Sequence, residues 1–237
     1  MTRIVIFANG DLNEPELLKK RFLPGDRIFC ANGGTLHALA LGLIPEVVVG
    51  DMDSLAPEIV TQLETSGVTI DRYPAHKDKT DLELTLAWAI AAQPDEIMLV
   101  TALGGRLDQM LANILLLTRP EYAASQLTLA DGRQWAAILR GPLQFTVTGQ
   151  PGDTLSLVPL AEGVQGVSIS GVKWPLEQVS LSLGSTLTIS NVLQASSAKV
   201  TVAEGLLLLI HIAGKLKTPI LEGGTNDVQN YQYRSTP

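Results

Sequence analysis

The chain has 237 residues, of which 46% are hydrophobic and 17% are charged, a balance that excludes an intrinsically disordered protein. Its 17 basic and 24 acidic residues give a formal net charge of −7, which argues against nucleic acid as a partner. No apolar run approaches the roughly 20 residues of a membrane span, and the N-terminal apolar stretch is too short for a secretory signal. Together with a single cysteine, Cys30, these features predict a cytoplasmic protein without a membrane segment.

The first 130 or so residues alternate short β-branched runs with longer helical patterns. The predicted strands span residues 4–8, 28–31, 47–50, 68–71, 97–101 and 127–130, and the predicted helices span 14–21, 35–43, 57–66, 81–92 and 107–118. Nearly continuous apolar strands that alternate with helices are typical of a mostly parallel sheet covered on both faces. We therefore predict an α/β domain over residues 1–138.

The composition changes after Arg140. Residues 141–214 contain only six charged side chains. Their short apolar runs, separated by Gly, Pro and Ser, lie at 144–148, 154–159, 167–170, 180–183, 187–190, 199–202 and 206–212. This rhythm is typical of an all-β sandwich or partial barrel, so we predict a β-sandwich domain over 139–214. Residues 215–237 have no period and form a tail whose composition is compatible with disorder.

Two carboxylates follow the predicted strand that ends at Gly50. Ligands of open parallel sheets bind beyond the carboxyl ends of the strands, and Asp51 and Asp53, at i and i+2 of an extended segment, point to the same side. Such a pair suits Mg²⁺, which one or two carboxylates and substrate phosphates commonly hold. The alternative is that Asp53 or Ser54 merely caps the helix that begins near Pro57, and the spacing alone favours neither.

A second polar turn, Lys77-Asp78-Lys79-Thr80-Asp81, opens the predicted helix 81–92. Thr80 and Glu83 fit a capping box, and Asp81 in the first turn suits the helix dipole. By itself this segment favours a cap, although capping requires neither Lys77 nor the additional carboxylates.

Two glycine pairs also follow predicted strands. In Gly104-Gly105-Arg106-Leu107-Asp108-Gln109, the glycines would let backbone N–H groups approach a phosphate, and Arg106 would add a bidentate clamp. Asn32-Gly33-Gly34 is a second such turn. Each is a weak signal alone, and the chain contains no P-loop motif.

Together, the turns at four strand ends collect side chains of both charges. They are Asp51, Asp53, Lys77, Asp78, Asp81, Arg106 and Asp108. Phosphoryl transfer needs this combination of carboxylates for a metal, cations for developing charge and backbone donors. The group therefore predicts a metal–nucleotide site. By contrast, Cys30 and the three histidines, His37, His76 and His211, have neither metal-ligand spacing nor the partners of a Ser-His-Asp hydrolase.

The β-rich half offers a different kind of site. Trp174 follows Gly171 and precedes a proline, and Ser190-Asn191 ends a predicted strand. An aromatic face can stack on a flat heterocycle or a cation, while small polar side chains read its edge. The alternative is that Trp174 belongs to the ordinary core of the sandwich.

The ordered set of these motifs resembles the thiamine pyrophosphokinase family. The set comprises Asn32-Gly33-Gly34, Gly50 to Ser54, Lys77 to Asp81, Gly104 to Asp108, Gly171 to Trp174 and Ser190-Asn191, and the resemblance spans roughly residues 4–213. It implies transfer of the pyrophosphoryl group of ATP to the hydroxyl of thiamine with Mg²⁺, giving thiamine diphosphate and AMP. It also implies an α/β domain for ATP, a β-sandwich for thiamine, and a homodimer whose site combines both subunits.

The resemblance also assigns roles to residues by position. Asp51, Asp53 and Asp81 look like the metal-binding and catalytic carboxylates. The thiamine pocket looks like Trp174, Ser190 and Asn191. The expected ATP-binding residues are Asn32, Gly33, Gly34, Lys77, Asp78, Thr80, Gly104, Gly105, Arg106, Asp108 and Gln109.

Three positions depart from the family pattern. Asn32 stands where the family usually has Asp, so one carboxylate near the nucleotide is missing and the resemblance leaves the number of metal ions open. Gln109 stands where many bacterial members have His, and Val192 where an acidic residue is common. Two alternatives stay open: a nucleotide-sugar-dependent transferase, because an Asp-x-Asp metal site also suits that chemistry, and a catalytically weak thiamine-binding module.

Overall fold

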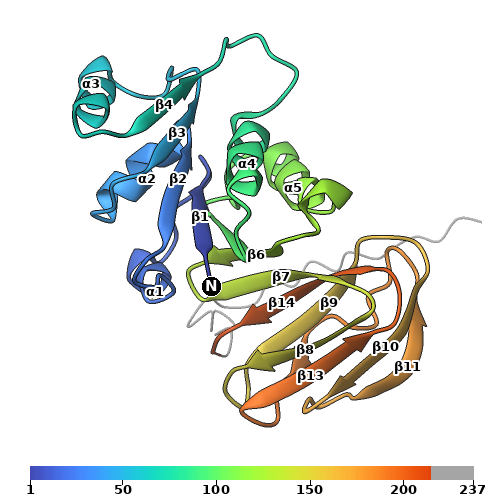
Figure 1. Ribbon diagram of the computed structural model, residues 1–237. Helices are drawn as coiled ribbons and strands as arrows, with labels where there is room; N and C mark the ends of the chain where they lie inside the picture. The colour runs from blue at the N-terminus through green and yellow to red at the C-terminus, as the bar shows by residue number, and fades with distance from the viewer. Residues whose placement is uncertain (215–237) are drawn as a thin grey trace, which may run out of the picture.

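The computed structural model describes residues 1–214, so the predicted tail lies outside the described residues (Figure 1). The helices are α1 (Pro15–Lys19), α2 (Gly34–Ala40), α3 (Pro57–Thr65), α4 (Asp81–Ala91) and α5 (Leu107–Leu116), with a 3₁₀ turn at Pro120–Tyr122. The strands of the first half are β1 (Arg3–Phe7), β2 (Arg27–Ala31), β3 (Val47–Gly50), β4 (Thr69–Arg72), β5 (Glu96–Val100) and β6 (Gln126–Asp131). Those of the second half are β7 (Gln134–Arg140), β8 (Leu143–Thr148), β9 (Thr154–Pro159), β10 (Val164–Ser170), β11 (Leu176–Leu181), β12 (Asn191–Val192), β13 (Ser197–Val202) and β14 (Leu206–Ile212).

A sheet of ten strands runs through the molecule in the order β12-β9-β14-β7-β6-β5-β1-β2-β3-β4. Strands β1 to β6 pair in parallel. One core cluster packs α4 and α5 against one face of the parallel strands, and another packs α1, α2 and α3 against the opposite face. The predicted parallel sheet with helices on both faces is confirmed, because strands without exposed faces must be apolar throughout.

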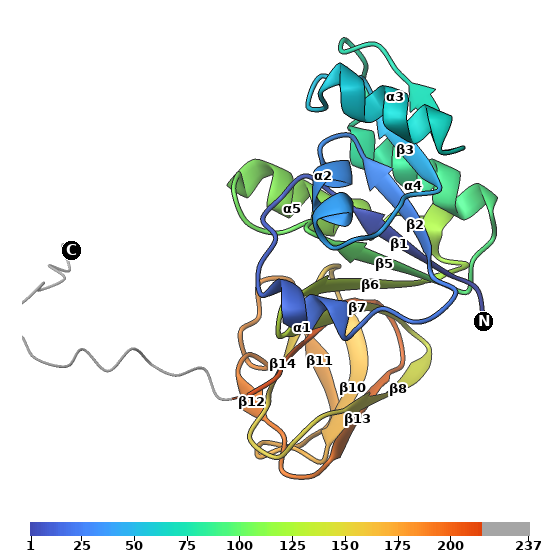
Figure 2. The ribbon, with the colours of Figure 1, turned by 90° about the vertical axis from the view of Figure 1, so that its left-hand side faces the viewer.

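The antiparallel strands β7, β14, β9 and β12 continue this sheet, and β11-β10-β13-β8 form a second sheet. Side chains between the two sheets, such as Leu157, Val200 and Leu209, form a separate core, which makes the predicted β-sandwich. Figure 2 shows the sandwich below the α/β layers. The predicted boundary at 138/139 falls inside β7, because the edge of the parallel sheet is also one layer of the sandwich.

Four element predictions differ from the structure, one of them the strand predicted at 180–183, which is β11 at Leu176–Leu181. The segment 187–190 forms turns instead of a strand, and only Asn191–Val192 pairs with β9. Strand β7 was not predicted, because Gln-Trp-Ala-Ala-Ile-Leu-Arg has little β-branched character; its pairing with β6 and β14 outweighs that weak propensity. Helix α1 has only five residues. Among residues 1–214, no helix is long and apolar enough to cross a membrane.

The topology separates the two predicted parts of the site. The carboxyl ends of β1, β2, β3 and β5 meet at one edge of the parallel sheet. Strand β12, which follows Ser190, lies at the far end of the same sheet, eight strand intervals from β3. At about 4.8 Å per interval, that is roughly 40 Å along the sheet.

Candidate functional site: a polar cavity, a carboxylate cluster and a distant tryptophan

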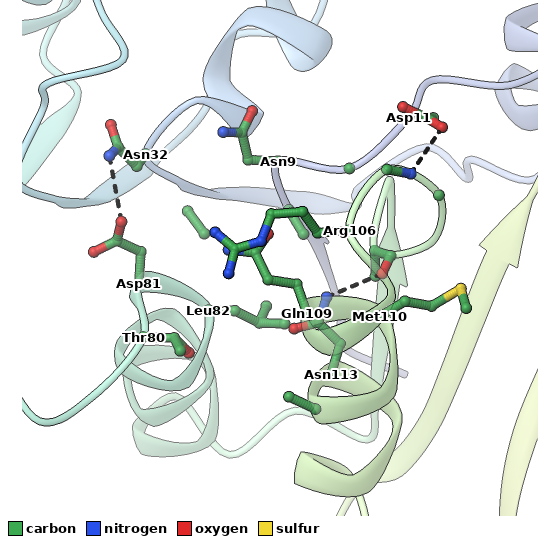
Figure 3. A pocket seen from close by; sticks show the side chains of 17 residues that line it. Asn9, Asp11, Asn32, Thr80, Asp81, Leu82, Arg106, Gln109, Met110 and Asn113 are labelled. Carbon is green, nitrogen blue, oxygen red and sulfur yellow. Dashed lines mark hydrogen bonds between the residues drawn. The ribbon is translucent and has the colours of Figure 1, made fainter.

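A cavity of about 450 Å³ opens at the carboxyl ends of β1, β2 and β5 (Figure 3). The predicted residues that line it are Asn32, Thr80, Asp81, Gly104, Gly105, Arg106 and Gln109. Figure 3 shows Asn32 and Asp81 on one side and Asp11 on the other, with Arg106 between them. The structure therefore brings together four of the turns that the sequence singled out, since Asp51 and Asp53 adjoin the cavity through Asn32.

Three carboxylates converge on one amide nitrogen. Asn32 Nδ2 lies 2.8 Å from Asp51 Oδ1, 2.9 Å from Asp53 Oδ1 and 3.3 Å from Asp81 Oδ2. Because carboxylates only accept hydrogen bonds, these partners identify the nitrogen side of the amide. Lys77 Nζ lies 2.9 Å from Asp81 Oδ1, so the cluster contains three carboxylates and one ammonium, which pairs with Asp81.

The electrostatics of this cluster favour ionised carboxylates. Three hydrogen bonds lower the pKa of Asp53 below its ordinary value: the largest effect comes from Asn32, and smaller ones come from Ser54 and Asp51. Asp53 is therefore negatively charged at neutral pH. An ionised Asp53 beside Asp51 and Asp81 creates a strongly negative concavity.

The donor set of the cluster fits a hard divalent cation. Asn32 is buried, and its Oδ1 has no hydrogen-bond partner. Carboxylate and amide oxygens are the ligands that Mg²⁺ prefers in proteins. Within residues 1–214, however, no three acidic, Cys or His side chains are arranged as a formed metal centre, because the carboxylates surround the amide nitrogen.

The reason for the convergence of Asp51 and Asp53 differs from the prediction. The segment is not extended, since Met52 adopts a left-handed conformation with φ 64° and is buried. The resulting turn, and not strand periodicity, brings both carboxylates to Asn32. The alternative that Asp53 or Ser54 caps the next helix is wrong, because the N-cap of α3 is Ala56 and no side chain bonds there.

Thr80 has the capping role that the sequence indicated. Its hydroxyl oxygen accepts a hydrogen bond from the Glu83 N–H at 3.2 Å, and it also lines the cavity. The cap therefore places Asp81, the first residue of α4, beside Asn32. Asp78 is exposed and does not line the cavity.

The two glycine pairs serve different purposes. A Cβ on Gly34 would lie 2.2 Å from the Phe7 carbonyl oxygen, and one on Gly33 would meet Asn9. This pair allows α2 to pack closely on β1, and neither glycine lines the cavity. Gly104 and Gly105 both have positive φ, and they form the cavity wall.

Asp11 holds the Gly104-Gly105 turn in place. The Gly105 N–H donates to Asp11 Oδ2 at 3.1 Å, so this donor is directed to a carboxylate in the protein itself. Arg106 forms a two-point ion pair with Asp108, with Nε–Oδ1 3.1 Å and Nη2–Oδ2 2.5 Å. This hydrogen bonding lowers the pKa of the exposed Asp108 carboxyl.

Sequence reasoning missed the part of the cavity that follows β1. Asn9, Gly10 and Asp11 line it, as do Met110 and Asn113 from α5. The ladder between β1 and β5 continues into this segment, since the Gly10 N–H donates to the Thr101 carbonyl at 2.7 Å. The available signal was an Asn-Gly-Asp turn after a buried strand, the same pattern that identified the other turns.

Trp174 and Asn191 form a unit on the sandwich. Trp174 is 54% exposed, so it does not belong to the sandwich core. Asn191 is buried, and its Oδ1 accepts from the Trp174 N–H at 3.1 Å while its Nδ2 donates to the Trp174 carbonyl at 2.7 Å. Asn191 Oδ1 also accepts from the Val192 N–H. The Asn191 amide therefore makes three hydrogen bonds to backbone groups, and one of its two amide hydrogens is not used in them.

Two neighbours complete this unit. The Lys173 ammonium lies 4.6 Å from the centroid of the Trp174 ring, a cation–π distance. Ser190 is exposed and has a left-handed φ of 60°, and its N–H donates to Ser156 Oγ. The unit offers an exposed aromatic face, and the exposed Ser190 directly precedes Asn191, which contacts Trp174.

Comparison with known proteins covers both halves of the chain. Residues 20–129 match the family described as "Thiamin pyrophosphokinase, catalytic domain", and residues 143–207 match "Thiamin pyrophosphokinase, vitamin B1 binding domain". A thiamine pyrophosphokinase of Bacillus subtilis is 33% identical over 178 residues, which is 75% of this chain and 83% of that protein.

Solved structures agree with the sequence matches. A thiamine pyrophosphokinase from Bacillus subtilis superposes with a TM-score of 0.80 at 29% identity, covering 90% of this chain and all of that one. One from Geobacillus thermodenitrificans gives 0.76 at 32% identity, over 90% of this chain and 98% of that one. The cavity, the carboxylates and the exposed tryptophan lie within a chain that belongs to the thiamin pyrophosphokinase family.

Proposed function

We propose that this chain transfers the pyrophosphoryl group of ATP to the hydroxyl of thiamine, releasing AMP. The carrying observation is the cluster of Asp51, Asp53 and Asp81 around Asn32 at the mouth of a polar cavity. Family membership favours this reaction over a nucleotide-sugar-dependent transfer, and the triphosphate would lie along the Gly104-Gly105 turn and Arg106. The cytoplasmic location stays a prediction from the sequence.

The reaction requires an acceptor for one proton and neutralisation of the phosphates. The thiamine oxygen attacks the β-phosphorus, the bond from that phosphorus to the α–β bridging oxygen breaks, and AMP leaves. One carboxylate among Asp51, Asp53 and Asp81 takes the hydroxyl proton. Lys77 and Arg106 offset the negative charge of the phosphates. Mg²⁺, which we propose these three carboxylates hold, supplies further charge neutralisation when bound.

We further propose that the active form is a homodimer in which Trp174, Ser190 and Asn191 of one subunit serve the carboxylates of the other. Within one chain the two groups are roughly 40 Å apart along the sheet, as the strand spacing implies, and a molecule with two small rings does not span that distance.

Exposed apolar side chains next to each group support this arrangement. Leu107, Leu111 and Leu115 are exposed along one face of α5, beside the cavity. Leu187 and Ile189 are exposed in the turns that lead to Ser190. A second copy would cover both patches while it completes the site.

The first test is incubation with ATP, Mg²⁺ and thiamine, followed by chromatography of the products. We expect AMP and thiamine diphosphate in equal amounts. ADP with thiamine monophosphate would contradict pyrophosphoryl transfer. Turnover with a nucleotide-sugar instead would favour the transferase alternative, and thiamine binding without ATP consumption would favour a binding module.

The shared site can be tested by subunit complementation. Assayed with thiamine well below KM, Asp53→Asn and Trp174→Ala are each expected to have at most about a tenth of the wild-type activity alone. If the site is shared, co-expression produces mixed dimers with one intact site, and activity returns to about a quarter of the wild-type value. A mixture no more active than the two variants alone would show that each site lies within one chain.

A further inference from the structure

The Asn32 amide contacts all three carboxylates of the cluster, and its nitrogen and oxygen have different surroundings. Its nitrogen contacts Asp51, Asp53 and Asp81, whereas its buried oxygen has no partner. An amide nitrogen has two hydrogens, so it cannot satisfy three carboxylates fully. A buried carbonyl oxygen without a partner also carries a desolvation cost. A cation bound among these groups would give both the carboxylates and the amide oxygen a partner.

The charge balance points the same way. Three carboxylates and the Lys77 ammonium leave a formal charge of −2 around Asn32. The amide contributes a dipole but no charge, so the repulsion among the carboxylates is only partly offset. A divalent cation would neutralise this remainder.

The backbone holds Asn32 in place for such a role. Asn32 has a left-handed φ of 44°, which Asn tolerates better than most residues. A Cβ on Gly50 would lie 2.9 Å from the Asn32 Cβ and 3.2 Å from Asp81 Oδ1, so the glycine allows the close approach. The side chain can turn about its Cβ–Cγ bond without moving the backbone.

We propose that Asn32 is a reversible placeholder for the divalent cation of the proposed function. Its nitrogen side holds the three carboxylates together in the metal-free protein, and on cation binding the amide turns over so that Oδ1 becomes a ligand. Asn32 is in this sense a positioning residue in one state and an oxygen donor in the other.

Thermal unfolding of Asn32→Asp tests the first half of the proposal without ATP or thiamine, and a second variant, Asn32→Gly, is used in the metal titration that follows. Asn32→Asp keeps the shape but replaces the donor with a fourth carboxylate, and Asn32→Gly removes the side chain at a tolerated φ. In EDTA, Asn32→Asp should unfold roughly 5 °C below the wild type, and saturating Mg²⁺ should close that gap. Equal melting temperatures in EDTA, or a gap that Mg²⁺ leaves unchanged, overturn the proposal.

Titration with Mn²⁺, followed by its electron paramagnetic resonance signal, tests the second half. Asn32→Asp should bind Mn²⁺ roughly tenfold more tightly than the wild type, and Asn32→Gly roughly tenfold more weakly because the oxygen ligand is lost. Binding by Asn32→Gly that equals the wild type excludes the turnover of the amide, and no binding by any variant overturns the whole proposal. Since neither assay contains substrate, these outcomes are independent of whether the protein makes thiamine diphosphate.

Discussion

The carboxylate cluster and the Trp174 unit are each organised by a buried asparagine, but the two amides do different things. Asn32 directs its nitrogen to three charged side chains. Asn191 directs both ends of its amide to backbone groups of Trp174 and Val192. In the carboxylate cluster, Asn32 binds side chains that can exchange partners. In the Trp174 unit, Asn191 fixes the backbone that carries the aromatic ring.

Because of this difference, we expect substitutions in the carboxylate cluster to affect activity and substitutions at Asn191 to affect stability as well. The carboxylate cluster holds repelling charges, so neutralising one of them should reduce activity without unfolding the protein. The Trp174 unit is neutral apart from Lys173 and is well hydrogen-bonded, so damage to Asn191 should affect both substrate affinity and stability. Four predictions test this contrast.

The largest effect is expected for Asp53→Asn. The isosteric change removes a charge that the structure keeps ionised, and we expect about a 10³-fold loss of kcat because charge stabilisation at the phosphates is lost. The melting temperature should not fall, since one of three like charges disappears. Product chromatography and thermal unfolding measure the two effects. Glu58→Gln, on the exposed face of α3, is the matched control, and unchanged turnover in Asp53→Asn would refute the assignment.

The next largest effects, on KM for thiamine, are expected for Asn191→Ala and Trp174→Ala. Both should raise KM for thiamine about tenfold. Trp174→Ala removes the aromatic ring, and Asn191→Ala removes the hydrogen bonds that hold the ring in position. Only Asn191→Ala should also lower the free energy of unfolding, by about 1–2 kcal/mol, since it removes the partner of part-buried backbone groups of Trp174 and Val192. Steady-state kinetics and urea unfolding separate the two. Equal stability of both variants would contradict a fixed platform.

A smaller effect is expected for Asp11→Ala. Losing the carboxylate that accepts the Gly105 N–H loosens the Gly104-Gly105 turn, and a contact worth about 1 kcal/mol corresponds to about a fivefold rise in KM for ATP. KM for thiamine should stay the same. If both constants rise equally, Asp11 supports the fold as a whole and not the nucleotide end.

The smallest effect is expected for Lys173→Met. The ammonium over the Trp174 ring competes with a cationic substrate for the same face, so its removal should tighten thiamine binding about two- to fivefold. Quenching of tryptophan fluorescence measures the affinity, with Lys199→Met on the neighbouring sheet as the control for lost charge. Weaker binding in Lys173→Met would show that the lysine helps to hold the substrate.

The alternation of apolar strands and helices predicted the parallel sheet because both faces of such strands are buried. The short apolar runs of the second half predicted the sandwich because Gly, Pro and Ser between them are typical of short strands joined by turns. Predictions from local sequence were wrong where pairing with neighbouring strands decides whether a segment forms a strand. Strand β7 has weak propensity and forms between β6 and β14, and the segment 187–190 looks like a strand but turns.

The residue types of the site follow from the sequence alone, because carboxylates, glycines and cations after strands are local features. Asp51, Asp81 and Asn32 were identified in this way, and the capping role of Thr80 was correct. What only the tertiary structure decided is how they combine: that Asn32 lies at the centre of the carboxylates, that Asp11 takes the Gly105 N–H, and that Asn191 holds the Trp174 backbone. These contacts join residues 17 to 94 positions apart, and a single sequence carries no record of which distant groups will satisfy each other.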